Sequence, residues 1–327
     1  MTYKKLGRTG LDVSVITMGS WVMGGGEWWG SDHDDRRYID TIKHAVDNGI
    51  NTIDTATGYG DGHAEELVGQ AVGSGREKLV LVSKANADAL MAHNAETTVD
   101  GSLKRLGTDY IDIYFIHWPQ PGISVAHNME ALEKLRQKGK IRFIGVSNFT
   151  KAHMDIARST GTVDVFQPPY SLFWRNIEKE LLPYCISHGI GVMTYSSIAM
   201  GLLSGKYTIC TQLEEGDIRK SMVPLFAGNT FQKALAAVET IRIVAQRSNA
   251  TVSQAAISWV YSQQGVATAI VGARTPTQLA ENLRAVEINF SNDDLKEMTL
   301  ASQPVNEDIA DWDTMYFKKA DAFRIVE

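Results

Sequence analysis

The 327-residue sequence has little of what marks several large classes of protein. It has two cysteines, Cys185 and Cys210, without the spacing of a thiol pair, which indicates a reducing compartment. Basic residues do not cluster and the formal net charge is −6, so no nucleic-acid partner is expected. No apolar stretch typical of a secretion signal is visible near the N-terminus, and there is no apolar run of about eighteen residues, so neither secretion nor membrane contact is expected. We therefore expect a cytoplasmic protein.

Three further absences narrow the chemistry. The eight histidines form no HxH or HxxxH pair, which disfavours a metal-dependent hydrolase or isomerase built on Asp54 and His117, so no metal is expected. The glycines at 24–26 lack the GxGxxG spacing, and no helix opens directly behind them, which argues against a Rossmann phosphate loop. No Tyr-x-x-x-Lys occurs, which argues against short-chain dehydrogenase chemistry.

What the sequence does contain is a regular alternation of short apolar strands and amphipathic helices. After an initial hairpin that turns at residues 7–10, strands are expected at 13–18, 51–54, 79–84, 110–117, 141–147, 163–167, 190–195 and 268–271. Helices are expected at 34–48, 63–73, 94–106, 125–138, 150–159, 176–188, near 230–248, at 252–263, 276–285 and 292–301, and an irregular tail follows. A long segment, 198–227, interrupts the rhythm.

This alternation predicts the fold. Strands joined by connections too long for hairpins form a parallel sheet. Eight such units match a closed (β/α)8 TIM barrel better than an open doubly wound sheet. The hairpin precedes the first barrel strand, so it can plug or cap the bottom of the barrel, and the last helix and tail are additions to it. No linker or composition shift separates a second domain, so residues 1–327 are expected to form one domain.

The expected strand ends are mostly polar, although the strand bodies are apolar. They are Gly19, Asp54, Lys84, His117, Ser147-Asn148, Gln167, Tyr195-Ser196 and Gly272. Taken singly, Asp54 could cap a turn, Lys84 could be an exposed strand end, and His117 could be a satisfied core histidine. Because the active sites of such barrels form at the carboxyl ends of the strands, their grouping there predicts a functional site.

Four residues suit one reaction in particular. Tyr59 lies on the loop after Asp54, and its hydroxyl is a poor acid near neutral pH unless its anion is stabilised. A neighbouring Lys84 cation would lower the pKa of that hydroxyl, and Asp54 would keep the lysine charged and fixed. His117 would orient a carbonyl by a hydrogen bond to its oxygen. The set suits protonation of an oxygen while another group is delivered to carbon.

The same residues carry a resemblance to the aldo-keto reductase family, over nearly the whole chain. The matching stretches, in order, are Asp54-Thr-Ala-Thr-Gly-Tyr-Gly60, residues 106–117, Gly139-Lys-Ile-Arg-Phe-Ile-Gly-Val-Ser-Asn-Phe149, Gln167-Pro-Pro-Tyr-Ser-Leu172, Gly201-Leu-Leu-Ser-Gly-Lys206 and residues 272–282. Through Trp118-Pro-Gln-Pro121 and Gln167-Pro-Pro-Tyr170 the chain most resembles bacterial members of the inositol-operon type. The resemblance implies NADPH-dependent reduction of a small-molecule carbonyl without metal or flavin. It also implies that Tyr59 is the acid, that Asp54 and Lys84 set its pKa, and that His117 orients the carbonyl.

The resemblance also implies a cofactor site. Ser147, Asn148 and Gln167 match residues that hold the nicotinamide carboxamide, and Tyr195 matches the aromatic on which that ring stacks. The residues expected around the rest of NADPH/NADP+ are Gly19, Trp21, Ser196, Gly201, Leu202, Gly205, Lys206, Gly272, Arg274, Gln278, Glu281 and Asn282. Among these, Arg274 suits a 2′-phosphate, and the segment after Ser196 would strap over the pyrophosphate.

The substrate side is defined mainly by aromatic residues on loops at the same end. Trp28, Trp29, Trp118 and Trp174 are expected to contact the substrate, beside polar residues such as Asp32, His33 and Arg175. Such surroundings suit sugars, cyclitols or aromatic aldehydes, and loop packing is the alternative explanation for them. The alternative function is a nucleotide-sensing regulatory subunit, since potassium-channel β subunits resemble this family.

Overall fold

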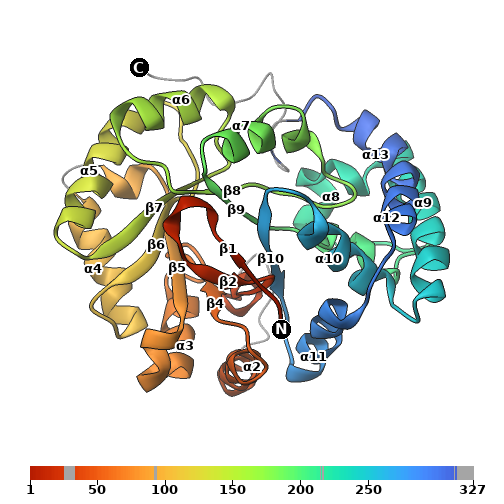
Figure 1. Cartoon of the computed structure of the whole chain (residues 1–327), viewed down its shortest axis with the longest axis horizontal. Coiled ribbons are helices and arrows are strands. Elements are labelled where there is room, and N and C mark those ends of the chain that lie inside the picture. The colour runs from red at the N-terminus through yellow and green to blue at the C-terminus, as the bar shows by residue number, and fades with distance from the viewer. Residues whose placement is uncertain (26–33, 92–93, 214, 216, 313, 315–327) are drawn as a thin grey trace.

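Eight parallel strands close into a barrel in the order β10-β3-β4-β5-β6-β7-β8-β9, with helices around it (Figure 1). The computed structural model describes residues 1–25, 34–91, 94–213, 215, 217–312 and 314. The barrel strands are β3 (Ile16–Gly19), β4 (Thr52–Asp54), β5 (Val80–Ala85), β6 (Ile111–Ile116), β7 (Ile141–Ser147), β8 (Val165–Gln167), β9 (Gly191–Thr194) and β10 (Val266–Gly272). The predicted TIM barrel is confirmed.

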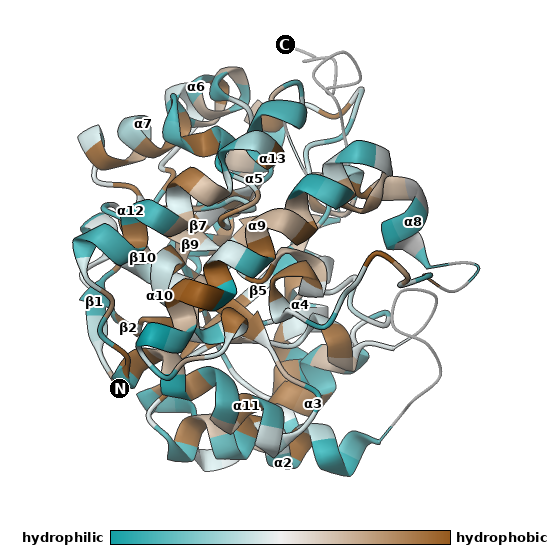
Figure 2. Cartoon of the chain, turned by 90° about the vertical axis from the view of Figure 1, so that its right-hand side faces the viewer, coloured by the Kyte–Doolittle hydropathy of each residue, from teal (hydrophilic) through white to brown (hydrophobic). Residues whose placement is uncertain are grey.

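The helices follow the strands in the predicted order. They are α2 (Asp35–Asp47), α3 (His63–Val72), α4 (Ala95–Leu106), α5 (Val125–Gln137), α6 (Lys151–Thr160), α7 (Leu181–Ser187), α8 (Ile218–Met222), α9 (Gly228–Arg247), α10 (Val252–Ser262), α11 (Pro276–Leu283), α12 (Asn292–Ala301) and α13 (Gln303–Asp308). Apolar residues of these helices belong to the buried core around the barrel, and the helix ribbons of Figure 2 combine hydrophobic and hydrophilic residues. None of the helices in the described part of the chain is long and apolar enough to span a membrane.

The hairpin of β1 (Tyr3–Lys5) and β2 (Asp12–Ser14) closes the bottom of the barrel. Leu6 and Val13 are fully buried in one apolar cluster with inward-facing strand residues such as Val82 and Phe115. A Cβ atom on Gly7, which has φ +50°, would lie 2.3 Å from the backbone nitrogen of Gly191, so the turn fits tightly against β9. The expected plug is therefore present.

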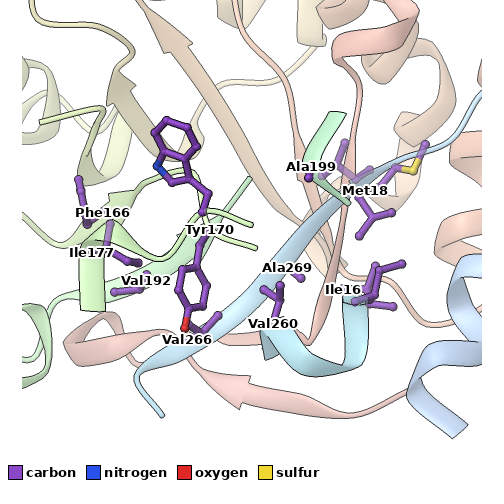
Figure 3. Close-up of a cluster of buried hydrophobic side chains, with 14 of the residues drawn as sticks. Ile16, Met18, Phe166, Tyr170, Ile177, Val192, Ala199, Val260, Val266 and Ala269 are labelled. Atoms are coloured by element: carbon purple, nitrogen blue, oxygen red, sulfur yellow. The ribbon is translucent and has the colours of Figure 1, made fainter. Parts of the chain in front are cut away.

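A second, larger core lies between the barrel and the helices. Figure 3 shows part of it, where Ile16, Met18 and Ala269 from the strands belong to the same buried cluster as Val260 of α10. Strands such as β6, Ile-Asp-Ile-Tyr-Phe-Ile, are buried along their whole length, because one face meets the barrel interior and the other meets helices. This rigid double core holds the strand ends in place.

Two predicted elements differ from the structure. The helix expected at 176–188 is split into a 3₁₀ turn, Asn176–Glu178, and α7, because Pro183 has no N–H to donate and would clash with a preceding helical turn. The irregular tail expected after residue 301 begins instead with α13, whose first turn contains Pro304. Proline is favourable there, since its missing N–H would have had no partner within the helix.

The tight barrel interior predicts a large effect of one added methyl group. A Cβ atom on Gly145 in β7 would lie 2.4 Å from the ring of Phe115, which is fully buried. Gly145→Ala should therefore lower the free energy of unfolding by about 1–3 kcal/mol in urea denaturation. Gly75→Ala is the control, since a Cβ atom at Gly75 would meet no atom of the described residues within 4 Å, and a change within about 0.5 kcal/mol is expected. Equal effects of the two variants would contradict the packing described.

Candidate active site

The carboxyl ends of the strands bring the predicted polar residues to one end of the barrel. The register pairs Gly19 with Asp54 across β3 and β4, and Ser147 with Gln167 across β7 and β8. Lys84 is the next-to-last residue of β5, and Gly272 is the last of β10. The residues that follow directly, His117, Asn148 and Tyr195, occupy the same end. Parallel pairing alone produces this convergence.

A buried ion pair lies at the centre of the site. The Lys84 Nζ donates to Asp54 Oδ1 at 2.6 Å and to the backbone carbonyl of Thr55 at 2.9 Å. It also lies 3.3 Å from the Tyr59 hydroxyl. Lys84 is fully buried and Asp54 is 3% exposed, so these contacts must compensate each charge for its lost hydration. Burial lowers the pKa of Lys84, and the Asp54 carboxylate opposes this shift.

Glycines place Tyr59 above the pair. Gly60 has φ +62°, and a Cβ atom there would lie 2.2 Å from the carbonyl oxygen of Gly24 on the loop after β3. The Tyr59 N–H donates to the carbonyl of Ala56, and its own carbonyl accepts from Ala64 at the start of α3. The tyrosine loop is thus fixed at both ends, and Tyr59 is partly buried.

His117 faces the tyrosine. The two rings meet edge to face, with centroids 5.7 Å apart and planes at 76°. Burial, followed by the nearby Lys84 cation, lowers the pKa of His117 well below 6.5. The imidazole is therefore neutral near neutral pH, with one N–H that can donate to an oxygen.

A hydrogen-bonded row of side chains lies beside these four residues. Ser147 Oγ donates to the Gln167 carbonyl at 2.7 Å, and Asn148 Nδ2 donates to the His117 carbonyl and to Ser147 Oγ, both at 3.0 Å. The Tyr195 hydroxyl donates to Asn148 Oδ1 at 2.7 Å. Asn148 has φ +60°, a conformation that costs energy in a non-glycine residue and is held here by its neighbours. The predicted carboxamide-binding residues are thus adjacent and fixed.

Gln167 has a second role that the sequence did not reveal. Its Nε2 donates to Asp54 Oδ2 at 2.8 Å, while Lys84 occupies Oδ1. The amide of Gln167 is 2% exposed, and its orientation is set by this bond. The side-chain oxygen of Gln167 is therefore directed away from Asp54. Because the backbone carbonyl of Gln167 accepts from Ser147, this residue links Asp54 to the row of side chains described above.

The segment after Tyr195 forms a strained 3₁₀ turn, Ala199–Ser204. Ala199, Met200 and Gly201 are consecutive residues with positive φ, at 49°, 54° and 91°. This conformation costs energy at Ala199 and Met200, and backbone strain of this kind is concentrated at ligand-binding sites. Leu202 is fully buried. Lys206 is exposed, and its Nζ lies 5.2 Å from the centroid of the Tyr207 ring.

The junction of β10 and α11 holds the remaining predicted cofactor residues. Gln278 Oε1 accepts from the backbone N–H of Arg274 at 2.9 Å, and Thr275 caps the helix by accepting from Gln278 N. The carbonyl of Glu281 accepts from Gln254, which leaves the exposed Glu281 side chain on the surface. Asn282 is half-buried one residue further on. Arg274 thus lies two residues beyond the carboxyl end of β10.

The aromatic residues predicted for the site fall into three groups. The ring of Trp21, predicted to contact the cofactor, lies 6.3 Å from that of Tyr59, and the Trp118 ring lies 6.2 Å from that of His117. Trp174 is 1% exposed, so a substrate contact by Trp174 requires this side chain to move. Trp28 and Trp29, like Asp32 and His33, lie outside the described residues.

No group of three or more histidine, cysteine or acidic side chains that could hold a metal ion occurs within the described ranges. Cys185 is buried and Cys210 is exposed, and both are free thiols.

The family comparison agrees with this geometry. The family model described as the aldo/keto reductase family matches residues 15–302. The chain therefore belongs to the aldo/keto reductase family, as its motifs predicted. The further resemblance to inositol-operon members stays a prediction.

Individual relatives cover almost the whole chain. Aldo-keto reductase YhdN of Bacillus subtilis is 37% identical over 309 residues, which cover 91% of this chain and 92% of that protein. The NADH-specific methylglyoxal reductase of Escherichia coli is 35% identical over 321 residues, which cover 90% and 98%. A solved aldo-keto reductase from Klebsiella pneumoniae in complex with NADPH is 31% identical, with a TM-score of 0.74 and coverage of 91% and 94%.

Sequence reasoning did not predict the contacts that support the four catalytic candidates from within the protein. The Thr55 carbonyl and the Gln167 amide complete the contacts of the ion pair. Glu65 is fully buried although it carries a charge. One signal was available for Glu65, because it lies among the apolar residues Ala64, Leu67 and Val68 on the inner face of the helix expected at 63–73.

The lowered pKa of His117 predicts how stability depends on pH. Because the folded pKa is below the unfolded value, the unfolded chain binds more protons below pH ~6.5, and stability is lost as the pH falls. His117→Asn should therefore lose less unfolding free energy than the wild type between pH ~7 and ~5, measured in urea. His153→Gln is the positive control, since burial lowers the pKa of His153 to about 4 and glutamine keeps the helix cap. An equal loss in His117→Asn and wild type would show that His117 titrates normally.

Proposed function

We propose that the protein reduces an aldehyde or ketone to the alcohol, reversibly, with NADPH as the reductant. The observation that carries the proposal is the placement of the Lys84 ammonium, 2.6 Å from Asp54 and 3.3 Å from the Tyr59 hydroxyl, at the catalytic end of the barrel. Proton donation to a carbonyl oxygen is the reaction that this arrangement favours.

Tyr59 is the proton donor. The Lys84 cation lies 3.3 Å from its hydroxyl and stabilises the phenolate left when the proton moves to the substrate oxygen. Asp54 holds that cation in place, and the Thr55 carbonyl fixes its direction. Because Asp54 serves Lys84 and accepts from Gln167, it is not a base for the substrate.

His117 orients the carbonyl. The neutral ring lies edge-on to Tyr59, so its N–H and the tyrosine O–H can converge on one oxygen. A neutral donor adds no positive charge that would hold the alkoxide unprotonated. Trp21 lies beside Tyr59 and Trp118 beside His117, and their rings would provide flat apolar surfaces for a sugar, cyclitol or aromatic carbonyl compound.

The residues present fit a nicotinamide dinucleotide. Within the described part of the chain, the Ser196 hydroxyl is buried without a hydrogen-bond partner, beside Tyr195 and the left-handed turn of residues 199–201. Asn148, Ser147 and the Gln167 carbonyl oxygen would hold the carboxamide, Tyr195 would support the ring, and the strap would hold the pyrophosphate. When bound, NADPH supplies the hydride to the carbonyl carbon.

NADPH is proposed over NADH because Arg274 lies just beyond the carboxyl end of β10, on the loop that the family resemblance assigns to the adenosine phosphate. A guanidinium binds a phosphate through two parallel charge-assisted hydrogen bonds. The Klebsiella structure contains NADPH, whereas the Escherichia coli relative is named for NADH. The preference therefore depends on residues of this chain, and Arg274 is the residue to test.

The alternative function, a nucleotide-sensing regulatory subunit, would require binding without turnover. The four residues are intact and in contact, which favours turnover. Oxidation of NADPH with glyceraldehyde separates the two functions, because a sensor would bind NADPH and leave it reduced.

Tyr59→Phe tests the reaction. The variant should bind NADPH almost as well as the wild type but reduce glyceraldehyde several orders of magnitude more slowly, because the proton donor is gone. Binding is measured by quenching of tryptophan fluorescence, and turnover by loss of NADPH absorbance. Tyr3→Phe removes the same hydroxyl at the exposed bottom of the barrel, where it donates to the Gly49 carbonyl, and should turn over normally. Near-normal turnover by Tyr59→Phe would reject the assignment.

Arg274→Ala tests the cofactor preference. Loss of the guanidinium should weaken NADPH binding at least about tenfold more than NADH binding, since only NADPH carries the 2′-phosphate. Dissociation constants for both cofactors give the ratio directly. Arg284→Ala, which removes an arginine beyond α11, should leave the ratio unchanged. Equal weakening of both cofactors by Arg274→Ala would place the 2′-phosphate elsewhere.

A further inference from the structure

A charged carboxylate is completely buried behind the proposed proton donor. Glu65 is the third residue of α3, the helix that begins four residues after Tyr59. Its relative exposure is 0%, and the helix residues around it, Ala64, Leu67 and Val68, are also fully buried. Carboxylates are almost never fully buried unless they are paired, because the loss of hydration is costly. The partners of Glu65 therefore show what holds it there.

The carboxylate joins three elements around the site. Ser83, the neighbour of Lys84 on β5, donates from Oγ to Glu65 Oε1 at 2.5 Å. Arg105, the next-to-last residue of α4, donates from Nε to Oε2 at 2.7 Å, and its Nη2 lies 2.7 Å from the same oxygen. One side chain on the tyrosine-bearing segment is thus tied to the lysine-bearing strand.

The arginine also contacts the tyrosine loop itself. Gly62 has φ +94°, and a Cβ atom there would lie 2.4 Å from Arg105 Nε. The guanidinium therefore lies directly against the backbone between Tyr59 and α3, in space that a larger residue would fill. Arg105 keeps 27% side-chain exposure, whereas Glu65 has none, so the negative partner is the deeper of the two.

The charges near this pair fall on two sides. Toward the active site lie Lys84, which the Glu65 charge helps to keep protonated, and beyond it Asp54, Tyr59 and His117. Behind lies Tyr114 of β6, whose pKa is raised by burial, with the Glu65 charge also raising it. At the outer surface near Arg105 are Asp61, Glu66 and Lys104.

We propose that Glu65 and Arg105 form a charge-balanced brace that positions Tyr59 against Lys84 and fixes the pH at which Tyr59 loses its proton. Both are positioning residues, since neither lies at the reacting atoms. The inference rests on the proposed function of Tyr59 as acid. It adds that the Glu65–Arg105 pair, as well as Lys84, controls the position and the titration of Tyr59. The pair has no net charge, because its two charges are opposite.

The brace predicts a defined electrostatic effect. Glu65→Gln keeps the shape of the side chain but leaves the Arg105 cation without its counter-charge. A net positive charge near the tyrosine favours the phenolate, so the titration midpoint of Tyr59 should fall, by about one pH unit for a charge ~10 Å away. The double variant Glu65→Gln with Arg105→Met is again neutral and should return the midpoint to the wild-type value.

The experiment measures tyrosinate directly and needs no substrate. Ultraviolet absorbance is titrated with pH for the full chain and for the same chain carrying Tyr59→Phe, and the difference gives the midpoint of Tyr59. Glu66→Gln is the matched control, because it removes a carboxylate one residue away that is 54% exposed and screened by water. It should leave the midpoint unchanged.

A fall in Glu65→Gln that the double variant reverses, with none in Glu66→Gln, supports the brace. An unchanged midpoint in Glu65→Gln, or a shift that the double variant keeps, overturns it. If Glu65→Gln does not fold, Arg105→Met carries the test, with an upward shift expected from the unpaired carboxylate and no shift overturning the proposal. The result is independent of turnover, so failure of the brace is distinguishable from failure of Tyr59 as the acid.

Discussion

The interaction on which the site depends is the buried contact between Lys84 and Asp54. Removing two charges from water costs several kcal/mol for each ion, and the attraction between them compensates only if their other hydrogen-bonding positions are filled. Here they are filled: Thr55 accepts from the lysine, Gln167 donates to the aspartate, and Tyr59 lies within reach of the ammonium. The reactive geometry is therefore also the geometry that lets the pair exist in the core. The need to fill the hydrogen-bonding positions of the Lys84–Asp54 pair thus also fixes the residues around it.

The parallel barrel explains why so much of this was visible in the sequence. Apolar runs of strand length, separated by helical periods, predicted the eight strands and their order, and parallel pairing then placed every strand end on one side. The polar residues at those ends, Asp54, Lys84, Gln167 and the pair at 147–148, could be read as a group because the rest of each strand is apolar. The hairpin could be placed as a plug because it precedes the first barrel strand.

Other features depend on contacts that no local pattern records. The bond from Gln167 to Asp54 joins residues 113 positions apart, and the left-handed turn at Ala199–Met200 uses residues without that preference. Glu65 looked like an ordinary acid in a first helical turn until Ser83 and Arg105 were placed around it. Proline accounts for both differences among the helices, since Pro183 lies in the first turn of α7, which begins later than the predicted helix, and Pro304 lies in the first turn of the unexpected α13.

The hairpin plug has a consequence for the order of events during turnover. With Leu6 and Val13 filling the bottom of the barrel, molecules can enter and leave only through the opposite end. The groups proposed to hold the cofactor ring lie at the strand ends, and the aromatic side chains proposed to meet the substrate lie beside Tyr59 and His117. If the two ligands stack there as proposed, the ligand nearer the barrel must bind first and leave last. The plug therefore adds an ordered mechanism to the proposal, with the nucleotide binding first.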